Sequence, residues 1–241
     1  MDRLIYLSMS GAKATMQRQE LISHNLANAS TNGFRAELTA LRSVPVQGDG
    51  ASTRAFVLET TPGYSAEPGP VSATGRNLDV AMKGNAWLSV QGLDGTEAYT
   101  RAGSLDVNAD GQLVTRNGLT VLGDGGPISV PANAQVLVGG DGTLTATVGN
   151  GRPQGIGRLK LVTPELALTR GTDGLFRSAD PLPADATARL QDGALEGSNV
   201  SPVEAMVAMI SAARQFEQQM KMVQSAQEKE QAATKLLSNQ A

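Results

Sequence analysis

Residues 201–223 read SPVEAMVAMISAARQFEQQMKMV, and this stretch decides the fold class because it predicts a long C-terminal helix. Ser201 can act as the N-cap, Pro202 takes the first helical position, and Glu204 lies three residues after the cap, which together form a capping box. Apolar residues then recur at alternating spacings of three and four, as in a coiled-coil seam. The predicted seam residues are Met206, Met209, Ala213, Phe216, Met220 and Val223.

The predicted helix extends well beyond its apolar seam. Past Val223 the same register passes mainly through polar residues before it reaches Leu237. We expect the helix to run from residue 202 to about residue 238, which gives it a length of about 55 Å. Because the last turns offer few apolar contacts, pairing there should be weak or should need a specific partner.

The first 34 residues show a fainter version of this pattern and predict a helix that ends near Asn32 and Gly33. Both ends can be helical because 25 of the 27 glycines lie within 48–197 and ten of the 11 prolines within 45–183. Each helix needs a partner for its apolar stripe, so we expect the two to pair as a coiled coil. The expected N-terminal seam residues are Ile5, Met9, Ala12, Met16, Gln19, Ile22 and Leu26.

Seven of the eight methionines lie in these two end segments. Methionine could simply fill gaps within one intramolecular helix pair, or it could serve packing among several copies of the chain. The high content of small and polar residues favours the second interpretation, because an isolated pair with this composition would be only marginally stable.

The middle of the chain predicts a compact all-β domain of antiparallel hairpins. Short apolar runs alternate there with Gly, Asp and Asn. Asp-Gly pairs at 94–95, 110–111, 141–142, 173–174 and 192–193 are typical of two-residue hairpin turns. The predicted strands are residues 86–91, 97–100, 104–107, 112–115, 120–122, 128–130, 135–138, 144–148 and 157–162.

These elements give a mixed fold in which a β-domain is bracketed by helices. The predicted organisation is an N-terminal helix in 1–34, an extended connector in 35–75, a β-domain in 76–162, a return connector with β-structure in 163–200 and a C-terminal helix in 201–241. We expect both helical segments to serve assembly.

Composition excludes several classes of site. The net charge is −3 and basic residues are scattered, so we expect no nucleic-acid partner. The chain has no cysteine and only one histidine, His24, which we interpret as a helix-surface or interface residue. The sequence contains no catalytic residue set and no phosphate loop, so we expect no enzyme, no cofactor and no small-molecule substrate. No apolar run is long enough for membrane insertion or a signal peptide.

One segment offers a sharper alternative, a calcium site in a secreted β-rich binding module. Residues 106–111, DVNADG, match the start of an EF-hand loop. However, the twelfth position of the loop is Asn117 instead of glutamate, and the residues on either side of the segment predict strands. A hairpin turn is the favoured interpretation.

Residues 25–34, NLANASTNGF, resemble the N-terminal motif of bacterial flagellar rod and hook proteins. Physically, the asparagines can bridge backbone groups where the helix ends, the glycine allows a turn, and the aromatic residue anchors the exiting chain. The positions that match the family motif are Asn25, Leu26, Ala27, Asn28, Thr31, Gly33 and Phe34.

The resemblance continues along the whole chain. It includes 76–90, 99–103, 111–115 and the segment 196–200 with the helix that follows, although Trp87-Leu88 stands where many members carry paired phenylalanines. The segments 1–6, 126–131 and 156–162 resemble proximal rod proteins most, with a distal rod protein as the alternative.

The resemblance implies a structural subunit that polymerises through its terminal helices and transmits torque across the periplasm. It also implies that the two helical segments form an inner assembly domain. Its implied partners are proximal and distal rod subunits and the flagellar type III export apparatus. Its implied location is the flagellar basal body, reached without a cleaved signal peptide. The motif residues at 25–34 and the six seam residues at 206–223 are the expected assembly contacts.

Overall fold

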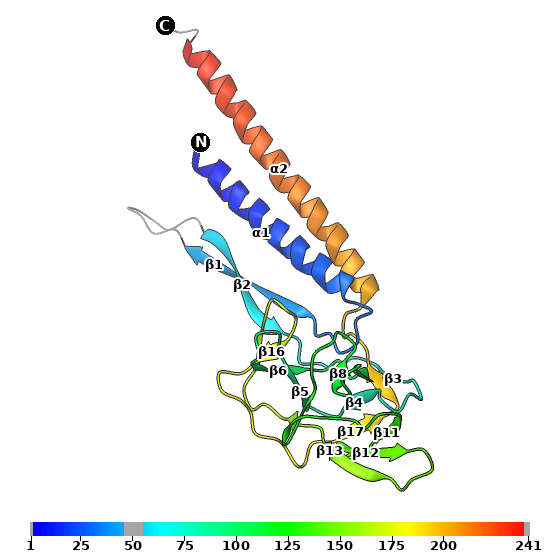
Figure 1. The fold of residues 1–241 in the computed structure, drawn as a ribbon. Coiled ribbons are helices and arrows are strands. Elements are labelled where there is room, and N and C mark those ends of the chain that lie inside the picture. The colour runs from blue at the N-terminus through cyan, green and yellow to red at the C-terminus, as the bar shows by residue number, and fades with distance from the viewer. Residues whose placement is uncertain (1, 46–54, 239–241) are drawn as a thin grey trace. The chain divides into compact units, whose positions relative to one another are not determined.

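The computed structural model describes residues 2–45 and 55–238, and they form two compact units (Figure 1). The helical unit contains both terminal helices and a hairpin, whereas the β unit contains the remaining strands. The chain passes between the units after residues 29, 36, 62 and 199. The helical unit covers 1–29, 37–62 and 200–241, and the β unit covers 30–36 and 63–199.

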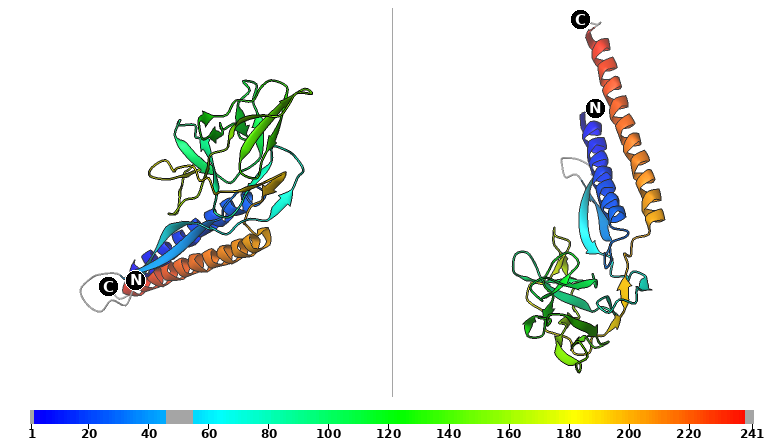
Figure 2. Two further views of the ribbon diagram at one scale, coloured as in Figure 1. Left: turned by 90° about the horizontal axis from the view of Figure 1, so that it is seen from below. Right: turned by 45° about the vertical axis from the view of Figure 1, so that its right-hand side comes forward.

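The helical unit is built on α1, Asp2–Ala27, and α2, Pro202–Ser238. The two helices run side by side in antiparallel directions (Figures 1 and 2). This confirms the predicted pair of terminal helices flanking antiparallel β-structure. The same unit holds β1, Glu37–Pro45, which pairs with β2, Ala55–Tyr64, as a two-stranded hairpin.

The observed seam of α2 differs from the predicted one at alternate positions. Met206 is 52% exposed, whereas its neighbour Ala205 is buried, and Ala212 is only 1% exposed. The α1–α2 contact therefore uses Ala205 and Ala212, each one position before the predicted Met206 and Ala213. The α2 side chains that are buried or partly buried along the observed seam are Ala205, Met209, Ala212, Phe216, Gln219, Val223 and Ala226.

The seam of α1 shifts in the same way, and small residues explain both shifts. Met9 and Met16 are exposed and Ser8 is buried, whereas Ala12 and Ile22 are buried as the predicted seam requires. A side chain placed on Gly11 would come within 3.1 Å of the Gln219 amide, so the two helices approach closely there. Alanine, serine and glycine occupy the seam because small residues let the two backbones approach closely. The methionines lie outside the seam.

The start of α2 and the end of α1 each carry a side-chain cap. The Ser201 hydroxyl accepts a hydrogen bond from the Glu204 N–H at 3.4 Å, in agreement with the predicted cap of α2. Helix α1 ends earlier than expected, at Ala27, where the Asn28 amide donates to the His24 carbonyl at 3.0 Å. Residues 28–33 then form turns.

The β unit contains short antiparallel strands in several small sheets. Its largest sheet in the described residues has the order β14-β5-β6-β16-β15, and a second has the order β11-β12-β13. The remaining pairs are β3 with β18, β4 with β17, β7 with β8, and β9 with β10. The bounds are β3 Val71–Ala73, β4 Val80–Met82, β5 Trp87–Gln91, β6 Glu97–Thr100, β7 Leu105–Val107, β8 Leu113–Thr115, β9 Leu122–Gly123, β10 Gly126–Pro127, β11 Ala134–Val138, β12 Thr143–Val148, β13 Gln154–Arg158, β14 Leu161–Val162, β15 Thr169–Arg170, β16 Phe176–Arg177, β17 Leu190–Asp192 and β18 Ala194–Glu196.

The predicted strands within 86–122 and 135–148 match observed strands or bridges. Several observed strands, however, were not predicted. Residues 128–130 form only an isolated bridge, between Ser129 and Gln112. The segment 35–75 was expected to be an extended connector, yet it contains the β1–β2 hairpin and β3. The missed strands β3 and β4 pair with β18 and β17, more than 100 residues away, so local sequence gives little indication of them.

Four of the five Asp-Gly pairs close hairpin turns, although the loops have three residues instead of two. In each loop the glycine has positive φ and its N–H donates back three residues, as from Gly95 to Gly92 at 3.0 Å. The fifth pair, Asp192-Gly193, separates β17 from β18, which pair with different strands. The 106–111 segment lies in the β7–β8 hairpin, where the Asn108 side chain accepts N–H bonds from Asp110 and Gln112.

The β unit has one large aliphatic core and a smaller aromatic cluster. Leu88, Leu105 and Leu113 are fully buried in the first. In the second, the ring of Phe176 lies 4.6 Å from that of Trp87 and 4.7 Å from that of Tyr64. The β unit thus has a dry core of its own, whereas the helical unit depends on a narrow seam of small residues.

Replacing Ala212 by aspartate tests the observed seam. An unpaired carboxylate would be buried between α1 and α2, which should cost about 3 kcal/mol or more of helix-pair stability. We expect thermal unfolding followed by circular dichroism at 222 nm to show loss of helix at a lower temperature. The control Ala232→Asp, at an exposed position of α2, should change the transition little, and equal effects of the two changes would contradict the observed register.

Candidate assembly site

The first part of the 25–34 motif ties α1 to β1 within the helical unit. The side-chain amide of Asn25 donates to the Glu37 carbonyl at 2.9 Å, and its oxygen accepts the Glu37 N–H at 2.9 Å. The side-chain amide of Asn25 therefore pairs with β1 as another strand would. His24 lies on the exposed side of the same turn, with its Nδ1 3.6 Å from the Glu37 carboxylate.

The following motif residues complete the helix end. Leu26 is partly buried and packs against the cluster formed by Ile22, Ala205 and Ala212. Ala27 is exposed and is the last residue of α1.

The second part of the motif belongs to the β unit. Thr31 is exposed, and its carbonyl accepts the Phe34 N–H at 3.2 Å. Gly33 has a φ of +70°, and a Cβ at this position would overlap the Arg101 backbone, so only glycine fits. Phe34 is buried, and the Arg170 guanidinium lies 4.6 Å from the centre of its ring.

A buried ion cluster lies directly after this motif and joins both ends of the β unit. Glu196, only 1% exposed, has one oxygen 2.8 Å from the Arg35 guanidinium, while the other accepts two bonds from Arg101, one of them at 2.7 Å. The Gly69 N–H donates to the same carboxylate at 3.1 Å, and the Gly33 N–H donates to the Glu196 carbonyl at 2.8 Å. Four separate segments of the chain therefore meet at one residue.

Arg101 uses all its donors inside the cluster. Besides its bonds to Glu196, its guanidinium donates to the carbonyls of Met82 at 3.0 Å, Gly84 at 2.9 Å and Ala86 at 2.7 Å. These backbone oxygens lie at β4 and the approach to β5. Arg101 thus fixes the position of Glu196 against the core strands.

The cluster holds two positive charges against one negative charge. Burial lowers the pKa of Arg35, Glu196 opposes that shift, and the charge of Arg101 reinforces it. Among the described residues Glu196 is the only carboxylate that contacts either guanidinium, and the Arg35 Nε has no hydrogen-bond partner. Removal of this one carboxylate would therefore leave two like charges buried side by side.

Asn199 provides a second junction in the β unit. Its side-chain oxygen accepts the Ala36 N–H at 2.7 Å, and its amide donates to the Glu67 carbonyl at 2.8 Å. Its backbone N–H donates to the Phe34 carbonyl at 3.3 Å. Asn199 therefore fixes Ala36, and lies itself, at the two points where the chain leaves the β unit for the helical unit.

Sequence reasoning singled out the segments 99–103 and 196–200, which hold Arg101 and Glu196, but assigned no role to these residues or to Arg35. Charged residues are usually exposed, so isolated arginines and glutamates in a sequence do not indicate a buried cluster. The signal that could have found them is their place in or beside family-like segments, since Glu196 opens 196–200, Arg101 lies within 99–103 and Arg35 directly follows 25–34.

The predicted contact residues of α2 divide between the seam and the surface. Val223 is buried in the seam, Met209, Ala213 and Phe216 are partly buried, and Met220 is 39% exposed. Met206 belongs to a stripe of exposed apolar residues at helical spacing, which we call the α2 stripe. The α2 stripe consists of Val203, Met206, Val207 and Ile210, which are 71%, 52%, 62% and 55% exposed.

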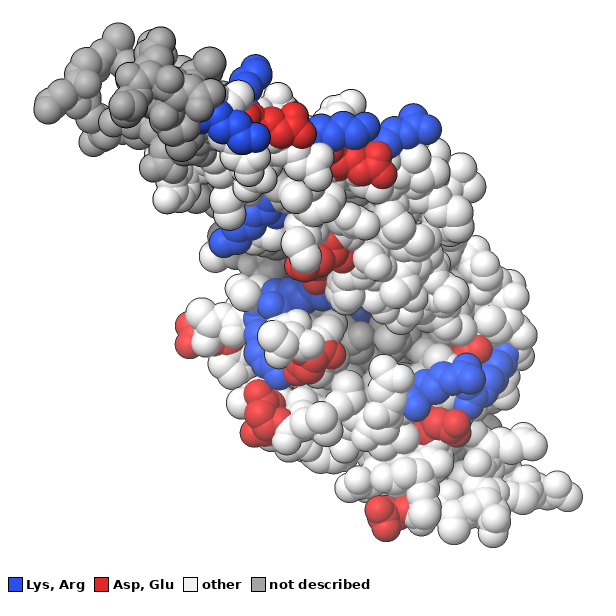
Figure 3. All heavy atoms as spheres, turned by 90° about the horizontal axis from the view of Figure 1, so that it is seen from above, with Lys and Arg blue, Asp and Glu red and all other residues white. Residues whose placement is uncertain are grey.

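Helix α1 also presents apolar side chains to solvent, namely Tyr6, Met9 and Met16. On the face shown in Figure 3, acidic and basic side chains are interspersed instead of being separated by sign. Across residues 2–45 and 55–238, no helix is long and apolar enough to cross a membrane, and no three potential metal ligands come together.

Three family comparisons together match most of the chain. Residues 5–35 match the family described as flagella basal body rod protein, 81–146 match the flagellar hook protein FlgE/F/G D1 domain, and 191–236 match the flagellar basal body rod FlgEFG protein C-terminal family.

Full-length relatives decide the family. The chain is 47% identical over 250 residues to the flagellar basal-body rod protein FlgF of Salmonella typhimurium, with 99% of each chain covered. It belongs to the FlgF family of flagellar rod proteins. The FlgF of Escherichia coli is 46% identical over 99% of each chain, whereas the FlgG of Agrobacterium fabrum is 31% identical over 94% of this chain and 96% of its own length. A chain of the FlgF family is a structural rod protein and not an enzyme.

Replacing Glu196 by glutamine tests the buried cluster. The change keeps the shape of the side chain but removes the only compensating charge, so we expect the β unit to lose about 3–5 kcal/mol of stability. Urea unfolding followed by Trp87 fluorescence measures this, since Trp87 is buried in the aromatic cluster of the same unit.

The matched control is Glu165→Gln, at an exposed position of the β unit. It should change the free energy of unfolding by less than about 0.5 kcal/mol. If Glu196→Gln were equally mild, Glu196 would not hold the junction as described.

Proposed function

We propose that this chain is a subunit of the proximal part of the flagellar rod and polymerises through its terminal helices to transmit torque across the periplasm. The greater identity to FlgF than to FlgG relatives supports a proximal over a distal position. We also propose that it reaches the periplasm through the flagellar type III export apparatus without a cleaved signal peptide. Family resemblance supports this route.

The single observation that carries the assembly role is the α2 stripe. Four large apolar residues lie at positions i, i+3, i+4 and i+7 of one helix, each more than half exposed, while the helix already pairs with α1 on another face. A contiguous apolar surface of this kind marks a contact with another protein. The family supplies the partner class, which is other rod subunits.

The length of the helices supports the same conclusion. Helix α2 has 37 residues and α1 has 26. Because they run antiparallel from a shared end near Ile22 and Ala205, α2 extends beyond the start of α1 (Figure 1). This extension beyond α1 supports a contact of α2 with a neighbouring subunit.

In this proposal some of the expected contact residues hold the subunit itself together, and others contact neighbouring subunits. The motif residues Asn25 to Phe34 fix where the chain leaves α1 and enters the β unit. The seam residues Met209, Phe216 and Val223 hold α2 against α1. Met206 and Met220, which the α1–α2 pair leaves exposed, provide contacts to neighbouring subunits.

Met206→Asp separates assembly from folding. We expect the purified variant to keep its helix content and unfolding midpoint, because the side chain is already exposed. In a strain that lacks the natural protein, however, it should fail to enter basal bodies and fail to restore swimming, because a charge in the stripe opposes burial against a neighbour.

The control Gln218→Asp introduces the same charge at an exposed polar position of α2 and should restore swimming. Normal swimming with Met206→Asp would exclude the α2 stripe as an assembly contact. Failure of the unmodified chain to enter rods would exclude the proposed function itself.

A further inference from the structure

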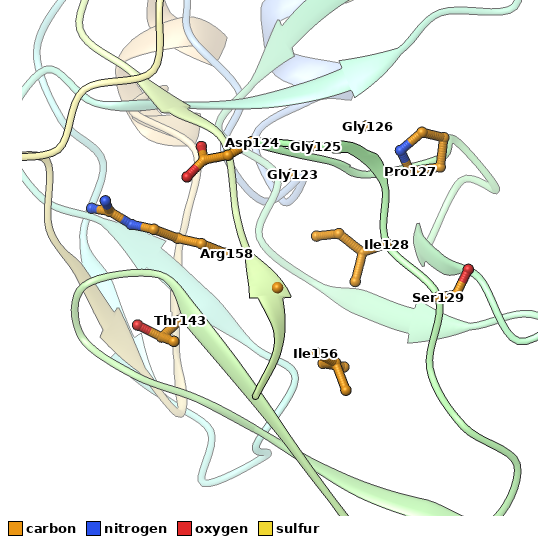
Figure 4. A pocket seen from close by; sticks show the side chains of 11 residues that line it. Gly123, Asp124, Gly125, Gly126, Pro127, Ile128, Ser129, Thr143, Ile156 and Arg158 are labelled. Carbon is orange, nitrogen blue, oxygen red and sulfur yellow. The ribbon is translucent and has the colours of Figure 1, made fainter. Parts of the chain in front are cut away.

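One hollow of the β unit, about 640 Å³ in volume, lies between the β9–β10 hairpin and β13 (Figure 4). Its walls already bond to each other. The Asp124 N–H donates to the Arg158 carbonyl at 3.2 Å, and Gly123 forms a bridge with Leu159. The Arg158 guanidinium donates to two further carbonyls of the β unit. The strand edges and the guanidinium of this hollow are therefore occupied within the subunit.

A smaller cavity of about 230 Å³ borders the Glu196 cluster. Met82, Arg101 and Glu196 line it and are buried, so they form its base. Lys83 and Gln191 also line it and are exposed, so they form its mouth. The cavity thus leads from the surface of the β unit to the buried ion cluster.

The cavity suits an apolar side chain. Pro68, Val71 and Ala81 give it apolar walls. Its base needs no polar ligand, because Arg101 uses all its donors within the cluster and both oxygens of Glu196 have partners. An engineered cavity of about 150 Å³ holds a benzene molecule, so this larger one has room for the side chain of a leucine. Such a side chain would also exclude water from the ion cluster, which strengthens the attraction between its charges.

Leu93 is a large apolar side chain that does not pack within its own subunit. It is 92% exposed at the tip of the β5–β6 hairpin. Hydrogen bonds fix the loop that carries it. The Gly95 N–H donates to the Gly92 carbonyl at 3.0 Å, and the Asp94 carboxylate accepts the Thr96 N–H at 3.0 Å and the Thr96 hydroxyl at 2.7 Å. A fixed loop loses little conformational entropy when its side chain binds a partner.

Leu93 and the cavity lie at opposite ends of the same hairpin. Leu93 follows the end of β5, whereas the cavity residues Gly84 and Arg101 lie shortly before β5 and directly after β6. A copy displaced along the direction of these strands can therefore place its Leu93 in the cavity of the next copy. Because such a contact joins two different surfaces, it can repeat along a filament.

The charges at the two surfaces are complementary. Beside Leu93, the Arg177 Nη2 lies 3.2 Å from the Asp94 carboxylate and 2.7 Å from that of Asp173, so two negative charges flank one positive charge. At the cavity, the two arginines and one glutamate of the cluster leave a net positive charge, and the exposed Lys83 adds another. These opposite net charges favour the approach of the hairpin tip to the cavity mouth.

We propose that Leu93 of one copy of this chain inserts into the cavity between Val71 and Met82 of a second copy. The leucine side chain fills the apolar space, and Asp94 meets Lys83 at the mouth. This contact joins β units, in addition to the contacts made by the α2 stripe. It rests on the proposed rod function.

An engineered disulfide tests the contact in assembled rods. The chain has no cysteine, so the double variant Leu93→Cys/Gln191→Cys carries one thiol at the hairpin tip and one at the cavity mouth. Basal bodies that contain this variant are oxidised with copper phenanthroline and analysed without reducing agent. We expect dimers and longer oligomers joined between positions 93 and 191, because each copy carries both surfaces. Each single variant should remain monomeric.

The matched control is Leu166→Cys/Gln191→Cys, which moves the first thiol to another loop of the β unit, where Leu166 is 84% exposed. It should give no oligomers. Absence of oligomers from rods that contain the Leu93 pair, or equal oligomers from the control pair, would overturn the contact and leave the rod function standing. Absence of the unmodified chain from basal bodies would instead contradict the rod function.

A second measurement needs no cross-link and decides the matter if the double variant stays outside the rod. For Leu93→Ser we expect about tenfold less of the chain in basal bodies, because the contact loses a buried leucine side chain. Its unfolding midpoint in urea should not change, since Leu93 is exposed in the free subunit. Leu93→Met should restore assembly, and the control Leu166→Ser should leave it unchanged. Normal assembly of Leu93→Ser would overturn the contact.

Discussion

The pairing of one buried carboxylate with two buried arginines is the constraint on which the β unit depends. Glu196 forms an ion pair with Arg35, near the N-terminal end of the unit, and accepts hydrogen bonds from Arg101, within its core. A charge buried at 1% exposure is tolerated only with partners of this kind. The cluster therefore requires residues 33–35, 69, 101 and 196 to be in place together, and it closes the β unit with segments from both halves of the chain.

The two units stabilise themselves by different means. The β unit has a dry aliphatic core, an aromatic cluster and strand pairs that join distant segments. The helical unit relies on a narrow seam of alanine, serine and glycine, and its larger apolar side chains lie on the surface. Such a division suits a subunit whose β unit folds by itself and whose helices gain further contacts in an assembly.

Local signals in the sequence predicted local structure well. The Ser201 cap and the following proline placed the start of α2, and the Asp-Gly pairs located four hairpin turns. The motif at residues 25–34 indicated the family, although α1 ends at Ala27, before the expected Asn32 and Gly33. In each case the physical cause lies within a few residues of the signal, so one sequence is enough to identify it.

Features that depend on distant partners could not be predicted in this way. Ala205 and Met206 differ by one position, and only the approach of α1 decides that the alanine is buried. Strands β3 and β4 form because β18 and β17 return to pair with them. Arg35 and Glu196 are 161 positions apart, and neither shows locally that it is buried with an opposite charge.

Native-state hydrogen exchange tests most directly whether Glu196 closes the β unit. The amides of Gly33 and Gly69 donate to Glu196, whereas the Val121 amide donates to Leu113 in the aliphatic core. If the cluster belongs to the cooperative core, the Gly33 and Gly69 amides should exchange with the same opening free energy as the Val121 amide. Exchange of Gly33 and Gly69 through a much smaller opening, while Val121 stays protected, would show that the junction opens by itself and would contradict this role of Glu196.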